Sequence, residues 1–196
     1  ERFHFAHADG RRHLSFGTTC YGWIHQPLER QEETLRTLAA GPFNKIRMCV
    51  FPKYYDFHKD PPVHHAFLRH PDGTLDWARP NPAHFDLLDR RIDELARLGL
   101  QADLILFHPY DNYEADERRF WGYHQMPAWA EDLYLRYVVA RYAACANVWW
   151  SLANEWDFMK SKTPDDWARF LQRVREEDPY GHLISIHNGP VMYDHH

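Results

Sequence analysis

An asparagine and a glutamate interrupt one of the most apolar stretches of this sequence, WWSLANEWDF at residues 149–158. A carboxylate is costly in such surroundings unless it is paired or has a function. Three tryptophans in the stretch can supply apolar walls, which desolvate a charged carboxyl group and raise its pKa. A raised pKa suits a general acid that works near neutral pH, which makes Glu155 a candidate proton donor. A helix cap or an ion pair with Arg47 is the structural alternative.

Two further polar residues are candidates for the same site. Asn154 can hydrogen-bond a ligand hydroxyl group, although asparagine is also common in turns that follow a strand. Arg47 lies inside an apolar run, where an unpaired charge is costly. We therefore expect Arg47 to have a carboxylate partner, for which Glu155 and Asp103 are candidates within this chain.

Polar and aromatic side chains also follow the other apolar runs. They are Thr18, Thr19, Tyr21 and Trp23 after the first run, Lys53, Tyr54, Tyr55 and Asp56 after the second, His108, Pro109, Tyr110, Asp111 and Asn112 after the third, and His187 and Asn188 after the fifth. Aromatic residues make up 16% of the chain, and 8 residues are tryptophan. Aromatic walls with a few polar groups suit a sugar, whose C–H faces stack on rings, so we expect a sugar-binding cleft or else a large aromatic core.

Five short apolar runs predict the strands that would position these residues. The runs are near-continuous rather than alternating, which is typical of strands buried on both faces. The predicted strands are residues 14–17, 46–51, 104–107, 148–152 and 183–186.

Helical patterns lie between the predicted strands. The clearest is residues 82–98, where apolar residues recur every three or four positions. Asn81 and Pro82 form a typical helix start, and Gly99 a typical end. The other predicted helices are residues 27–40, residues 129–145, and a segment that begins at Thr163 and ends before Pro179, in which Trp167 is expected to face the core.

Strictly alternating strands and helices predict a parallel α/β sheet wrapped by helices. No G-x-G-x-x-G motif follows the first predicted strand, so a dinucleotide-binding fold is not favoured. A parallel (β/α)8 barrel remains, in which residues just after the strands carry the chemistry. We expect residues 56–80 to form a long loop over that rim.

The composition limits the function further. The chain has 196 residues, enough for one domain, and a net charge of −5, so we expect neither a nucleic-acid nor a membrane partner. Its three cysteines show no zinc spacing or disulfide framework, and Cys49 and Cys145 are expected to pack in the core. No metal or cofactor is expected. The compartment is unknown: an odd cysteine count slightly favours the cytoplasm, and because the chain starts at Glu1 a trimmed leader is compatible with secretion.

The motifs at the strand ends resemble those of a known group of enzymes. The segment W-S-L-A-N-E resembles the fourth strand of clan A glycoside hydrolases. G-T-T-x-Y-G-W, K-I-R-M, L-F-H-P-Y-D and S-I-H-N-G, in that order, resemble the apiosidase-like branch of bacterial (β/α)8 glycosidases, which includes candidate endoglucanases. The resemblance covers nearly the whole chain and implies a hydrolase that acts on glycosides or oligosaccharides.

The resemblance also implies roles for individual residues. Glu155 would be the acid/base, Asn154 would bind the sugar 2-hydroxyl, and Arg47 would orient the nucleophile. His108 would contact the sugar, with packing as the alternative. Further sugar contacts are expected from Tyr21, Trp23, Tyr110, Asp111, Trp156 and His187.

One catalytic group is missing from the predicted pattern. The nucleophile of this clan is a glutamate after the seventh strand, and only five strands are predicted here. A complete barrel typically needs about 250 residues. We therefore expect residues 1–196 to be one catalytic-barrel domain that covers about five β/α units of a longer retaining glycosidase. Alone it would be inactive, and its partner would be the missing C-terminal half of the barrel.

Three alternatives remain open at this point. The barrel could bind carbohydrate without catalysis. It could be a metal-dependent hydrolase that uses His108, Asp111, His187 and Glu155. A second carboxylate within the chain could support an inverting mechanism, for which the carboxyl groups must lie about 6.5–9.5 Å apart. The candidates are Asp111, Glu114, Asp157 and Asp194.

Overall fold

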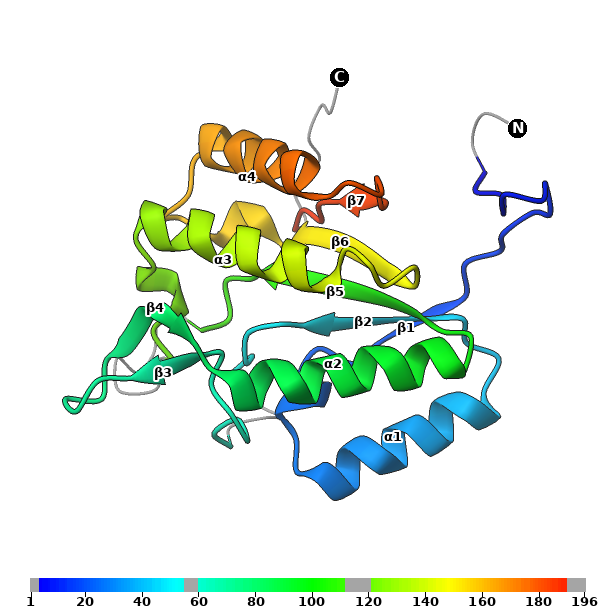
Figure 1. Ribbon diagram of the computed structural model, residues 1–196, viewed down its shortest axis with the longest axis horizontal. Helices are drawn as coiled ribbons and strands as arrows, with labels where there is room; N and C mark the ends of the chain where they lie inside the picture. Colours follow the sequence, from blue (N-terminus) through cyan, green and yellow to red (C-terminus); the bar gives the residue numbers. More distant parts are fainter. Residues whose placement is uncertain (1–3, 55–59, 112–120, 190–196) are drawn as a thin grey trace.

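Five parallel strands form a single sheet that carries four α-helices along one side (Figure 1). This computed structural model describes residues 4–54, 60–111 and 121–189. The sheet strands are β1 (Gly17–Thr19), β2 (Lys45–Cys49), β5 (Gln101–Phe107), β6 (Val148–Ala153) and β7 (Ile184–Ser185). The helices are α1 (Leu28–Ala40), α2 (Pro82–Arg97), α3 (Ala128–Tyr142) and α4 (Pro164–Glu177).

The strands lie in the sheet in the same order as in the chain, β1-β2-β5-β6-β7. A doubly wound sheet would instead reverse its strand order at a switch point. The observed order is that of consecutive β/α units in a barrel, as the sequence predicted. Within the described residues the sheet is open, because β1 and β7 each pair on one side only.

The two faces of the sheet differ in chemistry. Ile46 and Met48 of β2 are fully buried in the apolar core, whereas the alternate residues Lys45 and Arg47 lie on the opposite face. Core residues from the helices include Leu35, Leu38, Phe85, Leu88, Ile92, Leu95, Leu135, Val138, Val139, Phe170 and Val174. The sheet therefore has an outer apolar face against the helices and an inner face that carries charged groups.

Capping residues fix the starts of two helices. Asn81 Oδ1 accepts a hydrogen bond from the amide of Ala83 at 3.1 Å, and Pro82 occupies the first turn of α2, as predicted. Thr163 and Asp166 form a reciprocal capping box at the start of α4. Trp167 lies on α4 and is 6% exposed, which confirms its predicted place in the core.

The N-terminal segment lies at the amino end of the inner face. An antiparallel bridge joins Ala6 to Arg12. Phe5 and His13 pack on the indole of Trp149, with ring centroids 5.5 Å and 6.0 Å away. This contact occupies the end of the sheet opposite to the carboxyl ends of the strands.

Two predictions about secondary structure were wrong. The first strand was expected at residues 14–17, but Leu14 is 67% exposed and Phe16 stacks on Phe43 outside the sheet. Pairing with β2 begins at Gly17, opposite Lys45. The segment 56–80 was expected to be a loop, but its described part contains an antiparallel pair, β3 (Phe67–Arg69) and β4 (Leu75–Pro80).

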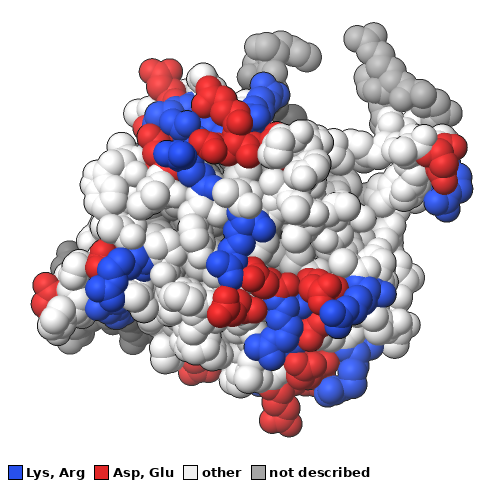
Figure 2. Space-filling model, in the orientation of Figure 1, with Lys and Arg blue, Asp and Glu red and all other residues white. Residues whose placement is uncertain are grey.

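Charged side chains on the helix-bearing face gather mainly over α1 and α2 and again over α4 (Figure 2). Positive and negative groups alternate in both areas, because many are paired, such as Arg141 of α3 with Asp86 and Asp89 of α2. The charge of this face is therefore mixed rather than basic. Among the described residues, no helix combines the length and the apolar character needed to cross a bilayer.

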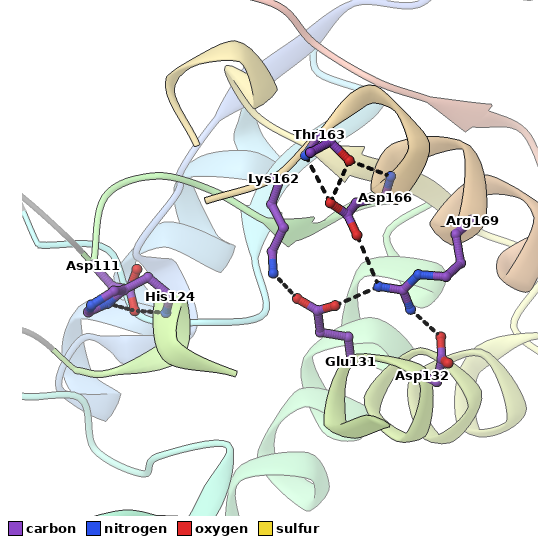
Figure 3. A network of polar contacts seen from close by, with 8 residues as sticks. All are labelled: Asp111, His124, Glu131, Asp132, Lys162, Thr163, Asp166 and Arg169. Atoms are coloured by element: carbon purple, nitrogen blue, oxygen red, sulfur yellow. Dashed lines mark hydrogen bonds and ion pairs between the residues drawn. The ribbon is translucent and has the colours of Figure 1, made fainter. Parts of the chain in front are cut away.

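A buried carboxylate joins α3 to α4 and to the loop before it. Glu131 of α3 is 1% exposed and pairs with Lys162 and with Arg169 Nη2, the latter at 2.7 Å. Figure 3 shows Glu131 between these two cations, with Asp132 on the far side of Arg169. Asp132 binds Arg169 Nη1 at 2.6 Å but is more exposed. The two acids therefore offer a matched comparison.

We expect Glu131→Gln to lower the free energy of unfolding by about 3 kcal/mol, because it leaves two cations without their buried counter-charge. Asp132→Asn, at the exposed end of the same network, should lower it by less than about 1 kcal/mol. Chemical denaturation followed by tryptophan fluorescence measures both values. Equal losses in the two variants would contradict the role assigned to Glu131.

A buried histidine on α2 makes the fold sensitive to acid. His84 is 2% exposed, its Nδ1 lies 3.3 Å from the carbonyl oxygen of His64, and its ring stacks on His25. Burial is the main cause that lowers the pKa of His84 to about 4. The unfolded chain, with a pKa of about 6.5, binds the proton more readily. The contribution of neutral His84 to the free energy of unfolding is therefore fully present above pH 6.5. It is lost as the pH falls from 6.5 towards 4.

We expect the free energy of unfolding to fall by about 2 kcal/mol between pH 7.5 and pH 5 through His84. His84→Gln should remove this part of the pH dependence, whatever it does to stability at pH 7.5. His70→Gln, at an exposed histidine, should keep it. Denaturation curves at the two pH values measure the difference, and an unchanged pH dependence in His84→Gln would refute the assignment.

Candidate active site

Glu155 stands directly after β6 in a left-handed backbone conformation, with φ 49° and ψ 53°. It is the one non-glycine residue with a positive φ in the described part of the chain. This conformation costs an L-residue roughly 1–2 kcal/mol. Residues held in such conformations cluster at functional sites, where the surrounding structure enforces them. The side chain is partly exposed, as a group that meets a ligand must be.

Backbone hydrogen bonds on both sides enforce this turn. The amide of Asn154 donates to the carbonyl oxygen of Phe107 at 3.0 Å, which continues the pairing of β5 with β6. The amide of His187 donates to Ala153 at 3.0 Å, and its carbonyl oxygen accepts from Trp156 at 3.1 Å. His187 therefore fixes the three-residue turn around Glu155 through its backbone, while its own side chain is exposed.

The carboxamide of Asn154 is held by two tyrosines. The hydroxyl of Tyr21, after β1, donates to Asn154 Oδ1 at 3.0 Å. Asn154 Nδ2 donates to the hydroxyl of Tyr110, after β5, at 3.3 Å. Asn154 itself is 1% exposed. Three of the residues predicted for the site are thus brought together, next to Glu155.

Lys53 lies against the same two tyrosines. Its Nζ is 4.0 Å from the ring centre of Tyr21 and 3.6 Å from that of Tyr110, and the residue is 7% exposed. Burial lowers the pKa of Lys53, and the negative charge of Glu155 acts in the opposite direction. Lys53 was noted after the second predicted strand but was not predicted as a site residue. The tyrosines that it contacts lie in other segments of the chain, so no local pattern pointed to Lys53.

Tyr21 is also sensitive to the charges of this site. Its pKa is raised, chiefly by burial, and the charge of Glu155 adds to the shift while that of Arg47 opposes it. The neutral phenol is therefore favoured. This protonation state suits a hydroxyl that donates a hydrogen bond to Asn154.

Arg47 pairs with Asp103 on the inner face of the sheet. Arg47 Nε lies 3.4 Å from Asp103 Oδ2, and Arg47 Nη2 donates to the hydroxyl of Ser151 at 3.1 Å. Lys45 binds the same carboxylate oxygen at 3.2 Å. Of the two partners considered for Arg47, the structure selects Asp103. A role in orienting a nucleophile stays a prediction.

His108 and Asp111 have structural contacts. His108 is 4% exposed, with Nε2 3.2 Å from the carbonyl oxygen of Phe51 and Nδ1 accepting from the amide of Tyr110 at 3.2 Å. Burial lowers the pKa of His108, so the neutral ring is favoured. Both nitrogens therefore serve the packing role that was the alternative to a sugar contact. Asp111 Oδ2 accepts from the amide of His124 at 2.8 Å, a pair that Figure 3 shows apart from the Glu131 network.

Two predicted aromatic contacts lie in different surroundings. Trp23 is 3% exposed in the core, where its indole nitrogen donates to the carbonyl oxygen of Gln31 at 3.1 Å. The structure therefore does not bring Trp23 to the rim, because the chain turns inward in a short 3-10 helix, η1 (Trp23–His25). Trp156 is partly exposed and packs edge-on against Trp167, with ring centroids 6.3 Å apart.

Two of the other candidate carboxylates, Asp111 and Asp157, accept hydrogen bonds from backbone amides. Asp157 Oδ1 accepts a hydrogen bond from the amide of Gly189 at 2.6 Å. Glu114 and Asp194 lie outside the described residues, as do Tyr55, Asp56 and Asn112. Among the residues that the structure describes, no three His, Cys, Asp or Glu side chains gather in a way that could hold a metal ion. The proposed metal set of His108, Asp111, His187 and Glu155 is therefore not assembled there.

Solved structures share this fold. A candidate glycoside hydrolase from Bacteroides vulgatus ATCC 8482 is 44% identical, with a TM-score of 0.87 over 97% of this chain and 38% of that chain. A glycoside hydrolase of family 5 from the same organism is 15% identical, with a TM-score of 0.63 over 94% of this chain and 38% of that chain. An exo-β-1,4-mannosidase from Opitutaceae bacterium strain TAV5 is 19% identical, with a TM-score of 0.60 over 93% and 33%.

The last two similarities concern the fold, which is that of consecutive β/α units from TIM-barrel glycoside hydrolases. The chain spans 38% of the length of the Bacteroides vulgatus protein that is 44% identical to it. No curated protein matches the chain. The model of the family described as "Apiosidase-like, catalytic domain" matches residues 1–196. This match covers the whole sequence, and the chain therefore belongs to the apiosidase-like catalytic-domain family.

Proposed function

We propose that this chain forms part of a glycoside hydrolase in which Glu155 is the acid/base of a retaining double displacement. The observation that carries the proposal is the left-handed conformation of Glu155, held at a strand end beside the fixed carboxamide of Asn154. Neither feature is needed to build a β/α unit. Both are expected where a carboxyl group must meet a bound sugar.

In the proposed reaction the carboxyl group of Glu155 donates its proton to the glycosidic oxygen as the bond to the anomeric carbon breaks. A second carboxylate attacks that carbon and forms a glycosyl-enzyme intermediate. Glu155, now ionised, then takes a proton from the water that releases the sugar. The second carboxylate is proposed to lie outside this chain, about 5–5.5 Å from Glu155.

A barrel of eight strands would need three more than the five that the structure describes. The open edges of β1 and β7 and the charged inner face support this completion, because unpaired edges and exposed inner positions are unfavourable in isolation. The remaining strands would also bring the second carboxylate. Residues 1–196 alone are therefore expected to lack hydrolytic activity.

We expect Glu155→Gln in the full-length protein to abolish hydrolysis of aryl glycosides with poor leaving groups, since those need proton donation. Glycosides with activated leaving groups should keep much of their rate in the first chemical step. Initial rates and burst amplitudes over a panel of aryl glycosides measure the difference. The loss on poor leaving groups should be at least about 100-fold, as is typical for removal of a general acid.

Asp157→Asn is the matched control, because Asp157 lies two residues further on and binds a backbone amide. In this variant the relative rates on glycosides with poor and with activated leaving groups should be the same as in the wild type. If the Asp157 variant selectively loses activity on poor leaving groups and the Glu155 variant does not, the roles assigned here are wrong. An inactive wild type that still binds glycans would favour the non-catalytic alternative, and loss of activity to a chelator would favour the metal-dependent one.

The strained backbone gives a test that needs no substrate. We expect Glu155→Gly to raise the free energy of unfolding by about 1 kcal/mol, because glycine adopts a positive φ without the steric cost. Glu155→Gln retains a Cβ and should leave stability within about 0.5 kcal/mol of wild type. Chemical denaturation of the three proteins measures this. A destabilised glycine variant would show that the Glu155 side chain has a structural role.

A further inference from the structure

Four side chains from four strand ends form one contact chain at the rim. Tyr21 follows β1, Lys53 follows β2, Tyr110 follows β5 and Asn154 follows β6. The ammonium group of Lys53 lies against both tyrosine rings, at 4.0 Å and 3.6 Å. The hydroxyls of the same two rings hold the two polar atoms of the Asn154 carboxamide, at 3.0 Å and 3.3 Å. The two tyrosines thus connect Lys53 to Asn154.

The position of Lys53 is costly without such contacts. A lysine that is 7% exposed has lost most of its hydration, and the loss disfavours its charged form. An ammonium group over an aromatic face recovers part of this energy, and the gain is largest where water is excluded. An apolar residue could fill the same space without the cost. The charge is therefore expected to have a use at this rim.

The two rings limit how the carboxamide can turn. Tyr21 donates to Oδ1 and Tyr110 accepts from Nδ2, so the carboxamide is hydrogen-bonded at both ends. Both hydrogen bonds last only while both rings keep their positions. The ammonium group of Lys53 is attracted to both rings and therefore restrains the position of each ring.

We propose that Lys53 is a positioning residue of this site, which clamps the rings of Tyr21 and Tyr110 and so fixes the carboxamide of Asn154 in the orientation that binds a sugar hydroxyl. The proposal rests on the proposed function for its catalytic consequence. Its structural part, that Lys53 sets the position of the two tyrosines and the amide, stands independently of any activity.

The test is a double-mutant cycle in the full-length protein with the best substrate of the aryl glycoside panel. Lys53→Met keeps the length of the side chain and removes its charge. We expect it to lower kcat/KM by about tenfold, within the range of a desolvated cation–π contact. Lys53→Arg, which keeps a cation able to contact both rings, should recover most of this loss.

In an Asn154→Ala background, Lys53→Met should change kcat/KM by less than about twofold, because the residue through which it acts is gone.

Lys45→Met is the matched control. Lys45 lies on β2, eight positions earlier in the chain, and its Nζ is 4.6 Å from the ring centre of Trp149 at the amino end of the sheet. Any effect of this substitution should be the same in the presence and absence of the Asn154 carboxamide. If Lys53→Met has equal effects in both backgrounds, Lys53 acts on general stability and the proposal is overturned.

Crystal structures of the wild type and Lys53→Met decide the structural part without any substrate. We expect the rings of Tyr21 and Tyr110 to move and the carboxamide of Asn154 to lose at least one of its two hydrogen bonds. An unchanged arrangement would overturn the proposal even if activity fell.

Should Lys53→Met fail to fold, Lys53→Gln, which is polar but uncharged, replaces it in both measurements. A wild type without hydrolytic activity would overturn the proposed function, while the crystal structures would still decide the role of Lys53.

Discussion

The parallel register of β2, β5 and β6 is the constraint on which the site depends. It pairs Arg47 with Asp103 across the first two of these strands and Phe107 with Ala153 across the last two. The strands consequently end at one edge, and the residues that follow them come from distant parts of the chain to the same place. Asn154 extends the pairing by one residue through its bond to Phe107. A slip of one position would turn the side chains of a strand to the other face and separate the inner ion pair.

A second constraint supports the segment that leaves the rim after Glu155. The chain passes through a 3-10 helix, η4 (Trp156–Phe158), before it reaches α4. Glu131 of α3 binds Lys162 before α4 and Arg169 within it, so the returning segment is tied to the neighbouring helix rather than to the sheet alone. Backbone pairing within the sheet thus fixes the strained turn at Glu155, and a buried ion-pair network fixes the segment that follows it.

The sequence predicted features that depend on local patterns and missed those that depend on side-chain direction. The start of α2 at Pro82 and the place of Asn154 at a strand end follow from capping residues and apolar runs, and both are confirmed. Leu14 was assigned to a strand because it is apolar, although the sheet begins three residues later. Trp23 was expected at the rim because it follows a strand, yet a short helix turns it into the core. Lys53 was overlooked because its ring contacts join three separate segments.

The contact of Phe5 and His13 with Trp149 makes the two ends of the inner face different places for substitution. At the amino end the protein's own aromatic side chains pack on one another, so replacements there alter this packing. At the carboxyl end the strands are followed by turns, and Glu155 on one of these turns is partly exposed. In parallel β/α barrels the loops after the strands can change while the sheet stays the same, so one sheet can carry different sites.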